Sequence, residues 1–169
     1  MDNIDFIKTY FTEEKIESLF FITLGIISTT LAFFFIFIIK YSFYKGFAYP
    51  ILIVGIIQLI VGTTVSMRSP KDLIRVNKTI KFEPQKIQTE ELPRMEKVMS
   101  NFTIYKWIEI ILIVASIILL IVYYSSQQTF WKGLALGLLI QTSIMLSLDG
   151  LAERRSQIYI EKLHEISKL

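Results

Sequence analysis

Seven ionisable residues stand at the borders of long apolar runs in this chain. They are Glu17, Glu109, Asp149, Glu153, Arg68, Arg154 and Arg155. An ionisable group beside a membrane-embedded segment is a candidate site for a cation, a proton or a lipid headgroup. The same residues could instead form ion pairs that hold helices together at one depth. We favour the ion pairs and keep the polar vestibule as the alternative.

Two glutamines are the deepest polar residues of the apolar runs. Gln58 shares a helix face with Gly55, and Gln141 shares one with Gly133 and Gly137, a G-x-x-x-G pair. Small residues let helices approach closely, and side-chain amides can form hydrogen bonds across the interface. We therefore predict a role in helix association, with a ligand or ion path as the alternative.

Signatures of metal or nucleotide chemistry are weak. The chain has no cysteine and one histidine, His164, which follows Glu161 by three residues. Such a pair is half of a carboxylate-bridged di-iron site, which needs a second pair. The sequence contains no glycine-rich phosphate loop and no nucleophile elbow. These features predict a noncatalytic protein with no cofactor and no metal.

Four apolar runs must position these polar residues. Hydrophobic residues make up 53% of the 169 residues, more than a soluble chain of this size can bury. Runs this long are typical of membrane-spanning helices. We predict an all-α integral membrane protein, a single membrane domain over residues 1–169 folded as a bundle of four transmembrane helices. The predicted spans are 16–39, 47–67, 107–124 and 131–148.

Basic residues predict the orientation of the spans. Fifteen lie in the two terminal segments and the connection 68–106, against three in the loops 40–46 and 125–133. Because positive residues are retained inside, both termini and the long connection should be cytoplasmic. The first apolar run is too long for a cleavable signal and is expected to remain as a span. Small size and charge asymmetry favour a bacterial inner membrane.

An internal repeat is suggested by two short phrases. Residues 43–48 and 130–135 share the pattern F-[YW]-K-G-x-A, and each opens the second helix of a hairpin. The pattern predicts two related hairpins of the same orientation. Alternatively, an aromatic and a basic residue beside glycine are simply a good start for a helix at the membrane interface.

Helical extensions are expected on the cytoplasmic side. Ser69-Pro70 is predicted to break the second span, and a new helix should begin at Thr89 and run into the third span. Residues 149–169 should form an amphipathic cytoplasmic helix, with apolar positions at Leu151, Ile158, Leu163, Ile166 and Leu169. Near the N-terminus, Ile4, Ile7 and Phe11 suggest a short, separate helix lying on the inner surface.

A partner surface is expected on the connection. Arg94, Glu96 and Lys97 are its candidate residues for a protein partner, and basic residues nearby are candidate ligands of anionic lipid. Acidic residues interleave with these basic residues, and this mixture argues against nucleic acid.

These features predict a noncatalytic multi-pass membrane protein embedded in the lipid bilayer. It would bind a partner protein or self-associate through its spans and cytoplasmic helices, as a scaffold, a regulatory subunit or an immunity protein does. The alternative is a small oligomeric channel or carrier, with a polar path at Gln58, Gln141 and the inner carboxylates.

Overall fold

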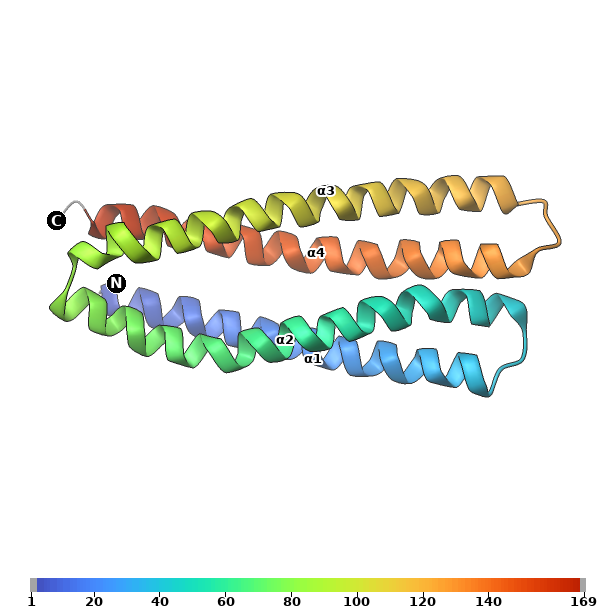
Figure 1. The fold of residues 1–169 in the computed structure, drawn as a ribbon, viewed down its shortest axis with the longest axis horizontal. Helices are drawn as coiled ribbons and strands as arrows, with labels where there is room; N and C mark the ends of the chain where they lie inside the picture. Colours follow the sequence, from blue (N-terminus) through green and yellow to red (C-terminus); the bar gives the residue numbers. More distant parts are fainter. Residues whose placement is uncertain (1–2, 168–169) are drawn as a thin grey trace.

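The chain folds into four long helices arranged as two antiparallel hairpins. The structure, a computed structural model, describes residues 3–167. All four helices are long and apolar enough to cross a membrane, which confirms the predicted helical architecture. Both termini lie at one end of the bundle, here called the terminal end, and the two short loops lie at the other, the loop end (Figure 1). The elements are α1 (Asn3–Phe37), α2 (Ser42–Phe82), η1 (Ile87–Glu91), α3 (Leu92–Tyr123) and α4 (Thr129–Ile166).

Each helix is much longer than a membrane requires. The four contain 35, 41, 32 and 38 residues, whereas about 20 residues span the hydrocarbon core. The separate N-terminal helix predicted from the sequence is wrong, because those residues continue directly into the first span as α1. The excess length places a four-helix layer at the terminal end, beyond the most apolar part of the bundle.

The predicted break at Ser69-Pro70 is also wrong. α2 runs unbroken through both Pro50 and Pro70. The Ser69 hydroxyl caps no helix and instead donates a 2.8 Å hydrogen bond to the carbonyl of Phe11 on α1. Packing against α1 along its length therefore keeps α2 helical despite the missing amide proton of the proline. Pro93, by contrast, lies in the first turn of α3, where proline fits a helix.

The contacts between helices define their order in the bundle. α1 packs on α2, α2 on α4, and α4 on α3, with a minor contact between α1 and α4. The backbone of α3 does not pack closely on α1 or α2 within residues 3–167. At the terminal end its side chains do reach both helices, because Met95 contacts the hydroxyl of Tyr10 and Arg94 lies 3.9 Å from Asp72. The third helix thus packs mainly against α4 and η1.

Glycine makes the contact between α1 and α2 close. A Cβ atom on Gly25 would lie 2.8 Å from the carbonyl oxygen of Gly55, and one on Gly62 would lie 2.8 Å from that of Ser18. Small residues allow this backbone approach, which drives helix association where no water is present to be expelled.

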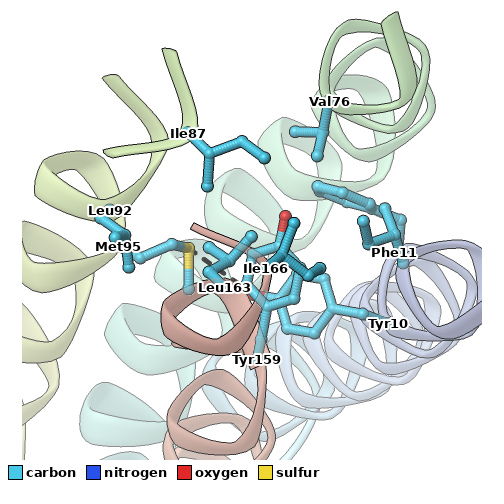
Figure 2. Close-up of a cluster of buried hydrophobic side chains, with 10 residues drawn as sticks. Tyr10, Phe11, Val76, Ile87, Leu92, Met95, Tyr159, Leu163 and Ile166 are labelled. Carbon is cyan, nitrogen blue, oxygen red and sulfur yellow. Dashed lines mark hydrogen bonds between the residues drawn. The ribbon is translucent and has the colours of Figure 1, made fainter. Parts of the chain in front are cut away.

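A hydrophobic core closes the terminal end. Figure 2 shows side chains from α1, α2, η1, α3 and α4 meeting there, as in a small water-soluble bundle. This terminal core consists of Ile7, Tyr10, Phe11, Val76, Ile87, Leu92, Met95, Tyr159, Leu163 and Ile166.

The buried face of the C-terminal extension matches the prediction only in part. Leu163 and Ile166 are buried as predicted, whereas Leu151 and Ile158 are 60% and 49% exposed. α4 buries Ala152, Ser156 and Tyr159 instead. The prediction failed because two of these three residues are small or polar, and they leave room for the rings of α1 rather than contributing an apolar stripe. Leu169 lies outside the described residues.

Candidate functional site

The two predicted glutamines meet in the middle of the bundle. The side-chain amide of Gln141 donates to the amide oxygen of Gln58 at 3.0 Å and to the hydroxyl of Ser28 at 3.4 Å. The amide of Gln58 in turn lies 3.3 Å from the sulfur of Met145. Both glutamines are buried. Their polar groups therefore satisfy one another across α1, α2 and α4.

The two repeated phrases meet at the loop end. A Cβ atom on Gly46 would overlap the carbonyl of Phe130, and one on Gly133 would overlap the carbonyl of Phe43. The contact is reciprocal, because each glycine faces the backbone three residues before the other glycine. No side chain larger than hydrogen fits either position without moving α2 and α4 apart.

The predicted ring of charges resolves into separate pairs at the terminal end. Arg155 on α4 pairs with Glu17 on α1. Glu153, also on α4, accepts a 2.7 Å hydrogen bond from Lys106 on α3. These two pairs join helices on opposite sides of α4.

Arg68 joins the first two helices. It lies 3.2 Å from Glu14 on α1 and 3.2 Å from Asp72, one turn further along α2. The sequence prediction missed Glu14, Asp72 and Lys106 as partners. The spacing of Arg68 and Asp72 was visible in the sequence, but the contacts between helices depend on how the hairpins pack.

Glu109 and Asp149 stand apart from the other pairs. Glu109 on α3 and Asp149 on α4 line the same cavity and lie close enough to repel each other when charged. Within residues 3–167, no lysine, arginine or histidine forms a salt bridge with either carboxyl group, and Oε2 of Glu109 is buried without a hydrogen-bond partner. The structure thus brings together two of the predicted acidic residues without a counter-ion.

A cavity of about 540 Å³ adjoins this carboxyl pair. This central cavity is lined by residues of all four helices, between the middle of the bundle and its terminal end. Its polar end includes Glu109 and Asp149, and its wall includes Val54, Val61 and Leu112.

A second hollow lies at the terminal end, between α1 and α4. This terminal groove encloses about 300 Å³, and Arg154 lies on its rim. In the described part of the chain Arg154 forms no salt bridge with an acidic side chain, unlike Arg155 beside it. Its lining residues are Phe6, Thr9, Tyr10, Glu13, Leu151, Arg154, Arg155 and Ile158.

The terminal core contains a buried ionic network, which the sequence prediction missed. The carboxylate of Glu91 accepts hydrogen bonds from Arg94 at 2.6 Å and from Arg75 at 2.9 Å. It also accepts one from the hydroxyl of Tyr159 at 3.1 Å. Glu91 is 1% exposed although it lies in a polar stretch of sequence. Nothing in the sequence pattern marks Glu91 as buried, because Arg75 and Tyr159, which contact it beside the neighbouring Arg94, come from distant parts of the chain.

Electrostatics keep this network ionised. Burial opposes the ionisation of Glu91, but the hydrogen bonds and charges of Arg94 and Arg75 outweigh burial and hold the pKa of that carboxyl below its usual value. Burial raises the pKa of Tyr159, and the charge of Glu91 raises it further, so the phenol keeps its proton and can donate it. Arg94 therefore belongs to the interior of the layer, whereas Glu96 and Lys97 are exposed on the surface expected for a partner.

Recognisable metal chemistry is absent from the part of the chain that is described. Residues 3–167 contain no group of three histidine, cysteine or acidic side chains placed to hold a metal ion. His164 is exposed near the end of α4. Comparison of the chain with protein-family models, curated proteins and solved structures finds no match.

Proposed function

We propose that the chain is a noncatalytic integral membrane protein that holds a protein partner at its terminal end, on the cytoplasmic side. Large apolar side chains are exposed on the outside of the bundle, among them Phe33, Ile53 and Ile111, as lipid contact requires. Basic residues at the terminal end outnumber those of the loops fifteen to three, which supports cytoplasmic termini. The same reasoning supports a bacterial inner membrane.

The observation that carries the proposal is the terminal groove. Leu151 and Ile158 are exposed there, on the part of α4 that extends beyond the predicted span. They lie two turns apart on one helix face, the spacing at which a groove receives an amphipathic helix. Arg154 on the rim offers a positive charge to that helix. The partner segment should therefore be amphipathic and should carry a carboxylate opposite Arg154.

Two related hairpins remain part of this proposal. The reciprocal contact of Gly46 and Gly133 supports a two-fold relation between the hairpins, with its axis along the membrane normal. Such an arrangement gives a rigid four-helix frame, which suits a scaffold or regulatory subunit.

The channel or carrier is the weaker proposal. A polar path needs groups that are free to exchange partners with a moving solute, whereas Gln58 and Gln141 are bonded to each other. Their closed arrangement favours a role in holding helices together.

Site-specific photo-crosslinking tests the partner proposal. A benzophenone amino acid at Ile158 samples the groove, and the same amino acid at Ile74, which is 71% exposed on α2, is the matched control. In cells that normally make the protein, we expect a defined crosslinked product from position 158 and none from position 74. Arg154→Glu should weaken the product at least severalfold.

The mass of the product separates the two forms of the proposal. A product of twice the mass of this chain indicates self-association, and any other defined mass indicates a different protein. Equal crosslinking at both positions, or a product at 158 that Arg154→Glu leaves unchanged, would contradict docking in the terminal groove.

A further inference from the structure

The central cavity has an opening toward the sides of the bundle. Within the described residues the backbones of α2 and α3 do not pack closely on each other, and residues of both helices line the cavity. Ile57 on α2 and Ile108 on α3 line the cavity and are still 45% and 49% exposed. By contrast, Ser18 and Phe21 line it from α1 and are buried. A molecule can therefore enter from the side, between α2 and α3, where a membrane-embedded bundle meets lipid.

The shape and chemistry of the cavity suit an amphiphile. Its volume of about 540 Å³ lies within the range of small-molecule sites, about 300–1,000 Å³. Apolar side chains line the part nearest the middle of the bundle, including Val54, Val61 and Leu112. Acidic groups gather toward the terminal end. A ligand with one apolar portion and one polar head would match both parts.

The cavity has more acidic than basic side chains in its lining, so the polar head of a ligand should be positively charged. Four carboxyl groups and two guanidinium groups line the cavity. Arg68 is paired with Glu14, and Arg155 with Glu17. In the described part of the chain, the remaining residues Glu109 and Asp149 form no salt bridge. Two neighbouring carboxyl groups without a counter-ion offer negative charge that a cationic head would neutralise.

The unsatisfied atoms of the cavity require a head that donates hydrogen bonds. Glu109 is 7% exposed, and its Oε2 atom is buried without a partner beside the cavity. Thr142, 2% exposed and deeper along the same wall, also has a hydroxyl without a partner. A primary ammonium group carries three N–H donors, whereas a quaternary ammonium group carries none. Both charge and hydrogen bonding therefore select a primary amine.

We propose that the central cavity binds an amphiphile with a primary ammonium head, which enters between α2 and α3. The head lies between Glu109 and Asp149, and the apolar portion lies along Val54, Val61 and Leu112. This ligand site is separate from the terminal groove and does not depend on a protein partner there.

Photolabelling of the full-length protein tests this site. The probe is a twelve-carbon primary alkylamine with a diazirine in its chain, added to protein in phosphatidylcholine nanodiscs, whose lipid has only quaternary ammonium groups. Labelled peptides are identified by mass spectrometry. We expect label within residues 54–61 of α2 and 108–112 of α3, displaced by dodecylamine at least about tenfold more effectively than by dodecanol, the difference that one charge-assisted hydrogen bond makes.

Two further competitors define the head and its source. Dodecyltrimethylammonium keeps the charge without N–H donors and should compete less effectively than dodecylamine. Phosphatidylethanolamine should displace the probe if the ligand is a membrane lipid, whereas failure of this lipid beside competition by dodecylamine assigns the site to a single-chain amine. Equal competition by dodecanol and dodecylamine in the unaltered protein would overturn the proposal, and this result needs no variant.

Substitutions locate the head. Glu109→Gln combined with Asp149→Asn keeps the shape of both side chains and should reduce labelling at least about tenfold. Glu153→Gln is the matched control, because Glu153 lies one turn from Asp149 on α4, is paired with Lys106 and does not line the cavity. Labelling retained in the double variant, or lost equally in the control, would overturn the assignment of the head.

Discussion

The two ends of this bundle are held together by different physical means. At the terminal end, large apolar side chains from every helix form a core around a buried ionic network. Toward the middle and the loop end, the contacts use glycine, serine and a pair of glutamines. The first arrangement gains stability by removing apolar surface from water, and the second by close backbone approach and hydrogen bonds across helices. The same four helices thus carry a water-type core and a lipid-type interface in series.

Removal of the Glu91 carboxylate should have the largest effect, and it should weaken the terminal end without changing the middle of the bundle. Glu91→Ala leaves Arg75 and Arg94 without their shared acceptor. We expect a loss of about 3 kcal/mol of local stability, the lower end for a broken buried ion pair, because both arginines keep some contact with solvent. Hydrogen exchange should rise in peptides covering η1 and the end of α4, and stay unchanged around Gln58. Glu90→Ala, at an exposed neighbour, is the control.

A methyl group at the loop end should have the next largest effect. Gly133→Ala places a Cβ atom against the carbonyl of Phe43, so α2 and α4 must separate. We expect the bundle to lose about 1–3 kcal/mol, as overpacked interiors do. Thermal unfolding in detergent micelles measures the loss. Gly46→Ala should behave alike, and a substantial loss at only one of the two positions would contradict a reciprocal contact.

The glutamine pair should contribute less. Gln58→Leu combined with Gln141→Leu removes both partners, and we expect a loss of about 0.6–2 kcal/mol, the range for hydrogen bonds between membrane helices. Each single substitution leaves the other amide unsatisfied and should cost as much as the double substitution, or more. A double-mutant cycle measures this coupling. Additive single effects would show that the two amides act independently.

A change in the opposite direction completes the series. Gly150 lies in the helical interior of α4, and a Cβ atom there would meet nothing within 4 Å. Gly150→Ala should therefore raise stability by about 0.5–1 kcal/mol, because alanine loses less conformational freedom in a helix. Both substitutions change helix propensity, but only Gly133→Ala adds a steric contact. The difference between their effects on stability therefore measures the cost of that contact. A loss at position 150 would reveal a contact on that face.

Hydropathy was sufficient to predict the four helices, because long apolar runs leave few alternatives. It could not predict where a helix continues beyond such a run. α2 passes Pro70 because Ser69 and its neighbours pack on α1, and that contact is tertiary. The exposed positions of Leu151 and Ile158 were misjudged for a related reason. The first part of the α4 extension buries Ala152 and Ser156 rather than Leu151 and Ile158, whereas its end buries the apolar Leu163 and Ile166.

The sequence was sufficient to identify individual candidate polar residues, but it did not predict which residues they contact. Gln58 and Gln141 stood out in the sequence as polar groups in apolar runs, yet their mutual hydrogen bond depends on the packing of α2 against α4. Glu91 was missed because a charged residue in a charged stretch resembles a solvent-exposed one. Its burial follows from Arg75, Arg94 and Tyr159, which arrive from three different helices.

The position of α3 at the edge of the bundle has a consequence for biosynthesis. A chain emerges from the ribosome in order, so α1 and α2 can pair as soon as both are made. α3 follows, but α4, on which it mainly packs, is still to be translated. Until then only its contacts at the terminal end, such as Met95 with Tyr10, can hold the third helix to the first hairpin. Completion of α4 then joins both hairpins in one step and closes the central cavity around whatever lies between them.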